Sequence, residues 1–306
     1  MNKYFIITID TEGDGLWSYD GKSKIPTRNL EFIPRFQELC EKYDMYPVYL
    51  VNYEVLEDVF FCKYIKEKVQ KGLCEVGIHI HAWNNPPLYD LPQKYNGNPY
   101  LVEYPYDVMR EKFRVTYELI KERFGVSPLS HRAGRWVMDK RYFKILEEFG
   151  ILVDCSYTPN VSWMKSSGAT RSYGCNYKYV LPYSHSVGNV LEVPMSVQKI
   201  RTFTGSTLKS RIYHILNKQI VWLRPAVNTL EEMTKLVDRI YFNKSIDHLE
   251  FMLHSSELMP SGSPYFQDKV AIDKLNSDIE SLFIYVKSKG FRSVTLKEYW
   301  NCKNGQ

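Results

Sequence analysis

The chain has 306 residues and a formal net charge of +5, with 44% hydrophobic and 25% charged residues. This composition is that of an ordinary globular protein and excludes a disordered chain, and no apolar run approaches the roughly 18 residues that a transmembrane helix needs. The N-terminal residues lack the features of a signal peptide, and the six cysteines show no Cys-x-x-Cys spacing. We therefore expect a cytoplasmic protein with reduced thiols and no disulfide framework.

The first half of the chain alternates between β-rich runs and helical patterns. Strands are predicted over 3–10, 45–53 and 74–81, and helices over 30–44 and 57–71. A longer helix is expected from the N-cap candidate Asp107 to Gly125, because apolar residues recur along it every three or four positions.

The second half continues this alternation. Strands are predicted over 129–133, 151–157, 189–196, 220–225, 248–256 and 291–296, and helices over 139–149, between the strands at 189–196 and 220–225, over 229–243 and over 270–288. Such alternation is typical of an α/β protein with a mainly parallel sheet or a barrel. The stretches 83–104 and 158–188 are predicted as long loops that shape a substrate cleft.

Pairs of reactive side chains stand at the ends of two predicted strands. His79 and His81 are one residue apart in a chain with only seven histidines, and Asp10 and Glu12 repeat that spacing. Side chains at i and i+2 of a strand project from the same face, and chemistry gathers at the carboxyl ends of parallel strands. One carboxylate and two histidines form a three-ligand set for a divalent metal. The alternative is that the carboxylates cap a turn and the histidines are structural.

Further candidates follow later strands. "SHRAGRW" brings Arg132 and Arg135 into a turn in which Gly134 permits unusual backbone angles. An arginine close to a buried carboxylate holds it ionised and aimed. His254 ends the strand "FMLH", where it could donate a proton.

These residues, in this order, resemble the motifs of the polysaccharide deacetylases of carbohydrate esterase family 4, the group with the NodB homology domain. "TIDTEGD" is similar to the first motif and "HIHAW" to the second, although Trp83 stands where the family has its second histidine and His81 replaces it. "RAGRW" resembles the third motif, "DCSY" at Asp154 the fourth and "FMLH" the fifth. The branch with DTE and HxH motifs is a divergent one.

The resemblance implies a distorted (β/α)7 barrel formed by residues 1–306 as a single domain, and removal of an acetyl group from an N-acetylated sugar. It makes Asp10 the catalytic base, Arg132 the residue that orients it and His254 the general acid. Glu12, His79 and His81 would hold one divalent metal ion, for which zinc is the first choice before cobalt, nickel or manganese. Substrate-binding roles fall to four residues: Trp83, Arg135, Trp136 and Arg224.

The region 155–230 has an uneven charge, because Glu192 is its only acidic residue among many lysines and arginines. This pattern indicates either an anionic partner or a solvated face without a partner. Arg201, Arg211 and Arg224 are candidates for binding the phosphates of a nucleotide- or lipid-linked sugar. The amphipathic segment 207–223 either lies on an anionic membrane surface, at the inner face of the membrane, or packs on the barrel.

Three other functions stay open at this point. The same fold and metal would also serve an O-acetyl esterase or a cyclic amide hydrolase, and a chain without catalysis would be a glycan-binding protein. A nucleic-acid partner is not expected, because the lysines and arginines do not form a sufficiently dense cluster.

Overall fold

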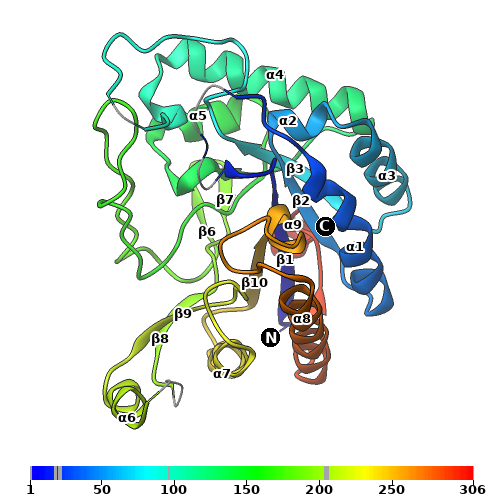
Figure 1. The fold of residues 1–306 in the computed structure, drawn as a ribbon, viewed down its shortest axis with the longest axis vertical. Coiled ribbons are helices and arrows are strands. Elements are labelled where there is room, and N and C mark those ends of the chain that lie inside the picture. Colours follow the sequence, from blue (N-terminus) through cyan, green and yellow to red (C-terminus); the bar gives the residue numbers. More distant parts are fainter. Residues whose placement is uncertain (1, 17–18, 20–22, 96, 203–206, 306) are drawn as a thin grey trace.

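The computed structural model of the chain describes residues 2–16, 19, 23–95, 97–202 and 207–305. Within these residues a nine-stranded sheet forms the centre of the molecule (Figure 1). Its strands are, in spatial order, β10 (His248–His254), β1 (Tyr4–Thr11), β2 (Pro47–Val51), β3 (Glu75–Ile80), β4 (Ser130–Ala133), β5 (Val153–Asp154), β7 (Val190–Glu192) and β6 (His185–Val187), with β11 (Arg292–Ser293) paired to β1. Only β6 runs antiparallel to its neighbour, so the strands from β10 to β7 all end at one edge.

Helices surround the outside of the sheet (Figure 1). They are α1 (Ile33–Lys42), α2 (Tyr53–Leu56), α3 (Val59–Gln70), α4 (Tyr106–Phe124), α5 (Lys140–Glu148), α7 (Leu230–Tyr241) and α8 (Lys269–Ser288). Short 3-10 helices lie at Arg28–Phe32, Leu101–Glu103, Gly134–Trp136 and Ser255–Leu258. The residues of β1 are buried on both faces of the sheet. This is expected for a parallel strand that is covered on each side.

The two faces of β1 belong to different cores. Phe5, Ile7 and Ile9 pack in the large cluster that also contains the apolar faces of the helices. Tyr4 and Ile6 point to the opposite face, into a smaller cluster that fills the interior of the curled sheet. Helix α9 (Leu296–Asn304) closes one end of this interior with Leu296 and Tyr299.

The curled sheet is nearly closed between β10 and β7. Backbone hydrogen bonds link Met252 to Leu223 over 3.2 Å and Leu223 to Ser196 over 3.0 Å, so the chain near Leu223 spans the gap. The expected α/β fold, a distorted barrel of parallel strands surrounded by helices, is therefore confirmed.

A small antiparallel sheet extends from the barrel. It pairs β8 (Val197–Ile200) with β9 (Gln219–Trp222), and α6 (Leu208–Leu216) lies at its far end (Figure 1). The sequence predicted the helix and one of the two strands. Within the described residues, no helix is both long and apolar enough to cross a membrane.

Several predicted boundaries are wrong. Helix α4 begins at Tyr106 after Pro105, so Asp107 lies in its first turn, where a carboxylate still favours the helix dipole. The strand expected over 151–157 is only β5, and the strand expected over 291–296 is only β11, because α9 begins at Leu296 with Thr295 as its N-cap. Gly125 ends α4 as predicted, with a φ of 75°.

Candidate active site

A cleft of about 670 Å³ opens at the carboxyl ends of the parallel strands. Along two strands, every second side chain points into the barrel interior, and the last of these side chains reach the cleft. On β1 the interior residues Tyr4 and Ile6 are followed by Thr8 and Asp10, and Asp10 pairs in register with His254 at the end of β10. The family resemblance assigned ten residues a catalytic, metal-binding or substrate-binding role, and nine of these ten line the cleft: Asp10, Glu12, His79, His81, Trp83, Arg135, Trp136, Arg224 and His254. The tenth, Arg132, lies buried beneath Asp10.

Three ligand-type atoms converge at the base of the cleft. The Nε2 atoms of His79 and His81 are 3.2 Å apart, and Glu12 Oε2 lies 2.9 Å from His81 Nε2 and 3.7 Å from His79 Nε2. Three ligands at about 2.1 Å from a tetrahedral ion lie roughly 3.4 Å from one another. The three side chains therefore have the spacing of a metal site with one further position open toward the cleft.

The surrounding groups fix the histidines in orientations suited to metal binding. His79 Nδ1 lies 2.9 Å from the Arg132 carbonyl oxygen, to which it can donate, which leaves Nε2 as a lone-pair ligand. Burial lowers the pKa of His81 and so favours the neutral form that a metal requires. For His79, burial opposes protonation, but Asp10 and Glu12 raise the pKa above its ordinary value.

Gly134 allows the histidine strand and the next strand to approach closely. A Cβ atom at position 134 would lie 2.3 Å from the Ile80 carbonyl oxygen and 3.0 Å from His81 Nδ1. The left-handed backbone angles that we expected at Gly134 occur instead at Arg135 and Trp136, with φ of 56° and 63°. Glycine is needed at position 134 for space, not for its backbone angles.

Arg132 is fully buried and holds Asp10 from below. Its Nη1 donates to Asp10 Oδ1 over 2.6 Å, and its Nη2 donates to Thr8 Oγ1 over 2.7 Å and to Glu250 Oε1. Burial alone would raise the pKa of Asp10, but the guanidinium, followed by His79 and His254, holds it below its ordinary value. Asp10 is therefore an ionised carboxylate whose Oδ2 lies 4.0 Å from His79 Nε2, beside the metal-ligand set.

Glu250 was not predicted as a site residue. It lies in β10 with its carboxylate fully buried, and burial raises its pKa to about 7 despite the nearby Arg132. The negative charge of Asp10 therefore balances the single positive charge of Arg132. Glu250 loses its proton near neutral pH. A lone glutamate inside the apolar run "HLEFML" was the available signal.

His254 faces both carboxylates across the cleft. Its Nε2 lies 3.9 Å from Asp10 Oδ2 and 4.0 Å from Glu12 Oε1. Its Nδ1 lies 3.2 Å from Glu257 Oε1 and 2.9 Å from Arg224 Nη2, and Arg224 also donates to Glu257 over 2.6 Å. A protonated Nδ1 can donate to Glu257, whereas a neutral Nδ1 can accept from Arg224.

Glu257 was also missed by the sequence analysis. It follows His254 by three residues, in the 3-10 helix after β10, and is fully buried. Burial opposes its ionisation, but Arg224 and then His254 lower its pKa below the ordinary value. Arg224, expected to bind substrate, therefore pairs with Glu257 and His254 while lining the cleft.

Tryptophans form the walls of the cleft. Trp83 stacks on His81 with ring centroids 4.4 Å apart and an interplanar angle of 11°. Trp136 is stacked with Trp163 at 6.3 Å, and Trp222 contacts both rings. Flat apolar surfaces of this kind suit the faces of sugar rings. Trp163 and Trp222 were not predicted, since only the folded chain brings them to Trp136.

Arg135 lines the cleft, and its side chain also bonds to the protein. Its guanidinium donates to the carbonyl oxygens of Asn98 and Ser167, each over 2.8 Å, and lies 4.1 Å from the ring centroid of Tyr100. The side chain thus joins the two long loops that bound the cleft. It shapes the binding site while its own donors bind the protein.

The loop after β1 is fixed around Glu12. Asn29 and Ser255 donate to the Glu12 carbonyl oxygen over 2.7 and 2.9 Å, and the Glu12 backbone N–H donates to Ser255 Oγ over 3.0 Å. The carboxylate that caps the turn is that of Asp14, which accepts from the backbone N–H of Asn29 over 3.0 Å. Asp10 and Glu12 thus remain directed at the cleft.

Asp154, the residue of the fourth motif, lies outside the cleft. It accepts from His131 over 2.7 Å and from Ser156 over 2.8 Å, and all three residues are fully buried. Burial and the neighbouring Asp154 raise the pKa of Glu192 well above its ordinary value. This cluster stabilises the strands β4, β5 and β7 rather than contributing to the cleft.

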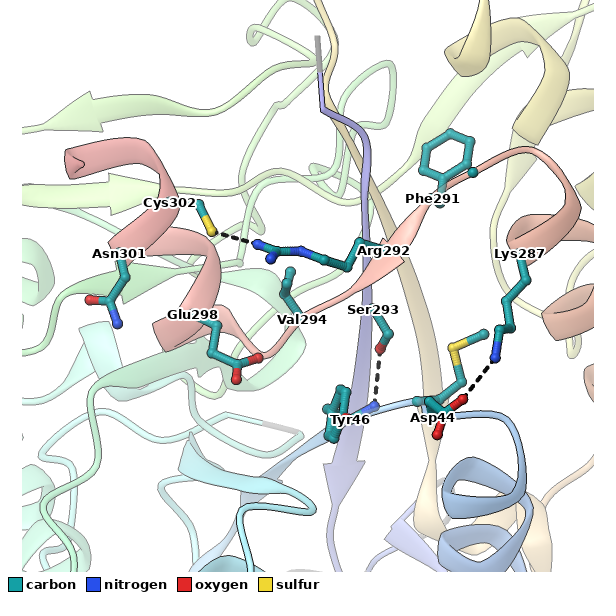
Figure 2. A pocket seen from close by; sticks show the side chains of 12 residues that line it. Asp44, Tyr46, Lys287, Phe291, Arg292, Ser293, Val294, Glu298, Asn301 and Cys302 are labelled. Atoms are coloured by element: carbon teal, nitrogen blue, oxygen red, sulfur yellow. Dashed lines mark hydrogen bonds and ion pairs between the residues drawn. The ribbon is translucent and has the colours of Figure 1, made fainter. Parts of the chain in front are cut away.

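A second hollow lies at the opposite end of the barrel, around β11 (Figure 2). Arg292 pairs in register with Tyr4, six residues before Asp10, so the hollow lies roughly 20 Å from the site. Arg292 Nη2 lies 2.9 Å from Cys302 Sγ, Ser293 Oγ accepts from the Tyr46 backbone N–H over 3.0 Å, and Lys287 pairs with Asp44 over 3.0 Å. These polar groups join chain segments to one another.

Comparison with known proteins places this fold. No protein-family model and no curated protein sequence matches the chain. Among solved structures, a protein from Mycobacterium smegmatis described as a polysaccharide deacetylase has a TM-score of 0.54 and 17% identity, over 100% of this chain and 92% of its own. A family 4 acetyl xylan esterase from Clostridium thermocellum, in complex with a cobalt ion, has a TM-score of 0.50 and 16% identity, over 99% of this chain and 92% of its own.

A third structure, 4-alpha-glucanotransferase from Thermococcus litoralis, has a TM-score of 0.59 and 13% identity, over 98% of this chain and 40% of its own. The chain is therefore a distorted α/β barrel with its cleft at the carboxyl ends of the strands. More particularly, it has the fold of the polysaccharide deacetylases. Because these names include a glucanotransferase, the fold alone does not decide the reaction.

Proposed function

We propose that the chain belongs to the polysaccharide deacetylase family and is a metal-dependent hydrolase that removes the acetyl group from an N-acetylated sugar. The observation that carries this proposal is the ionised Asp10, held by Arg132, beside the Glu12, His79 and His81 ligand set and opposite His254. A glycan-binding protein without catalysis would have no need for a buried arginine beneath a carboxylate or for a paired histidine.

A divalent ion at Glu12, His79 and His81 would supply polarisation of the acetyl carbonyl and acidification of a water molecule. Asp10 accepts the proton of the attacking water through Oδ2, the oxygen that Arg132 does not bind. Arg132 keeps this carboxylate ionised and fixes its rotamer, so the base is ready before substrate arrives.

His254 acts on the opposite side of the reacting carbon. As an imidazolium it donates its Nε2 proton to the departing amine, while its Nδ1–H is oriented by the Glu257 carboxylate. Arg224, next to the same Nδ1, also donates to Glu257 and so holds that carboxylate in place. The tryptophans at 83, 136, 163 and 222 form the walls against which the sugar would stack.

Acetate release from N-acetylated oligosaccharides, measured with zinc, cobalt, nickel or manganese, tests this function. We expect Asp10→Asn to lower kcat by about 10²- to 10⁴-fold, the usual contribution of a general base, with metal content unchanged. His81→Ala should lose the metal and the activity together. A folded wild type that takes up none of these ions would contradict the proposal.

An O-acetyl esterase is the second candidate, because one structure of the same fold is named an acetyl xylan esterase. An alkoxide leaving group needs less protonation than an amine. We therefore expect His254→Ala to abolish N-deacetylation, whereas ester hydrolysis would decline less. Parallel assays on an acetylated xylan and on an N-acetylated oligosaccharide, with wild type and His254→Ala, distinguish the two.

A further inference from the structure

A second charged site lies outside the cleft, between helix α7 and the arm formed by β8, α6 and β9. A hollow of about 480 Å³ there is lined by five cationic side chains and one apolar side chain: Lys199, Ile200, Arg201, Lys218, Lys235 and Arg239. The first three come from β8 and the residue after it, Lys218 precedes β9, and the last two lie one turn apart on α7.

The positive charges of this hollow are poorly neutralised. Lys235 pairs with Glu231 over 2.5 Å. In the described part of the chain, Lys199, Arg201, Lys218 and Arg239 form no ion pair. Like charges that converge at one place repel one another and raise the local positive potential. The hollow is therefore suited to a partner that carries several negative charges.

Exposed apolar side chains accompany these charges on the same arm. Leu208, Ile212 and Leu216 follow one another at four-residue spacing on α6, so they share a face, and they are 76%, 49% and 68% exposed. The side chain of Arg211, which the sequence indicated as a phosphate-binding candidate, lies outside the described residues.

One cation and one exposed apolar side chain share a face of the small sheet. Ile220, which is 41% exposed, pairs directly with Lys199 across the two strands. Directly opposed residues of an antiparallel pair point to the same face. Cations together with exposed leucines and isoleucines in one segment are the composition of chains that lie in the interface of an anionic bilayer.

We propose that the arm of β8, α6 and β9 docks the protein on an anionic lipid surface. Lys199, Arg201, Lys218 and Arg239 would bind the headgroups, and Leu208, Ile212 and Leu216 would enter the acyl boundary. A soluble polyanion would account for the charges alone and would leave the exposed leucines without a role. This inference does not depend on the reaction proposed for the cleft.

The arm connects this surface to the cleft. β9 ends at Trp222, which lines the cleft and pairs with Val197, and it begins at Gln219, which pairs with Ile200 beside the cations. Three residues of a strand span about 10 Å. In Figure 1, α6 lies at the end of the arm farthest from the barrel.

Co-sedimentation with lipid vesicles tests the proposal without any activity measurement. Vesicles would contain phosphatidylcholine alone or with about one-third phosphatidylglycerol. We expect binding only to the anionic vesicles, weakened by added salt. The double variant Lys199→Glu, Arg239→Glu should lower the vesicle affinity at least about tenfold, and Leu208→Ser, Leu216→Ser should lower it several-fold.

Matched variants on other elements control for net charge and hydrophobicity. Lys63→Glu with Lys140→Glu changes the net charge equally, and Val59→Ser replaces a residue that is 81% exposed on α3. Both should bind as wild type does.

Equal binding by the arm variants and these controls would overturn the proposal, as would absence of binding to anionic vesicles. Binding lost only in the charge variant and displaced by inorganic pyrophosphate would identify a soluble anion instead. A dimer that the leucine variant dissociates would identify a second copy of the chain.

Discussion

Two buried carboxylates share one guanidinium beneath the cleft. Arg132 contacts Asp10 and Glu250, and the pKa of the two acids is displaced in opposite directions. Asp10 is partly open to the cleft and is held ionised, whereas Glu250 is fully enclosed and has a pKa of about 7. A neutral Glu250 leaves the whole charge of Arg132 available to the proposed base.

The stability of the Glu250→Gln variant tests whether Glu250 has a raised pKa while Asp10 stays ionised. The pKa of Glu250 is higher in the folded chain than the roughly 4.3 of an unfolded glutamate, so its contribution is complete below about pH 4 and is lost as the pH rises through about 7. We expect the free energy of unfolding of wild type to fall relative to Glu250→Gln between pH 5 and 8, by on the order of 3 kcal/mol. Urea unfolding of both proteins at pH 5 and pH 8 measures this difference. Unfolding free energies that change with pH in the same way in both proteins would contradict the prediction.

Gly134→Ala tests the close approach of strands at the proposed metal ligands. The added methyl group meets the Ile80 carbonyl and the His81 ring, so we expect a loss of about 1–3 kcal/mol in stability and a weaker metal affinity. Gly72→Ala is the control. Its φ is 68° with no atoms near the new Cβ, so it should cost stability by backbone strain and leave the metal affinity unchanged. Normal metal binding by Gly134→Ala would argue against this role.

At the scale of elements, the Arg135 side chain joins two loops that form one rim of the cleft. Arg135→Ala removes its bonds to Asn98 and Ser167, so we expect KM to rise about tenfold while kcat changes little, since the reacting groups lie on the strands. Arg141→Ala is a matched control, because Arg141 also bonds loop carbonyls, at Val102 and Tyr104, but does not line the cleft. A large fall in kcat with unchanged KM would place Arg135 in the chemistry instead.

The elements also show what the sequence could and could not predict. Alternation of strands with helices located the parallel strands, and i, i+2 spacing placed Asp10 with Glu12 and His79 with His81 at one edge. The strand end at 291–296 was misjudged because Val294 and Leu296 are apolar for a different reason, as they plug the barrel interior. Glu257 reaches the site from the 3-10 helix after β10, and Trp222 reaches it from the arm. The path of such segments leaves no periodic pattern in a single sequence.

At the scale of the whole molecule, the ligand set joins two separate strands of the barrel. Glu12 follows β1, His79 lies in β3 and His81 follows that strand, so an ion bound there would link segments almost 70 residues apart and would stabilise only the folded chain. At one hundred times the Kd, one ion contributes about 2.7 kcal/mol, which corresponds to a rise of roughly 5 °C in Tm.

We therefore expect zinc to raise the Tm of wild type and to leave that of His81→Ala unchanged. Differential scanning calorimetry with and without a chelator measures both. Asp10→Asn, which keeps all three ligands, should retain the shift. An equal shift in His81→Ala would mean that the ion binds elsewhere.

The stacking of Trp83 on His81 has an optical consequence. Indole fluorescence is sensitive to an ion bound at the edge of the stacked imidazole, and the two rings are nearly parallel at 4.4 Å. Cobalt or nickel arriving at His81 would quench that emission by electronic contact with the ligand ring. The cleft therefore contains its own titration signal, one that Trp83→Phe should remove while leaving the bound ion in place.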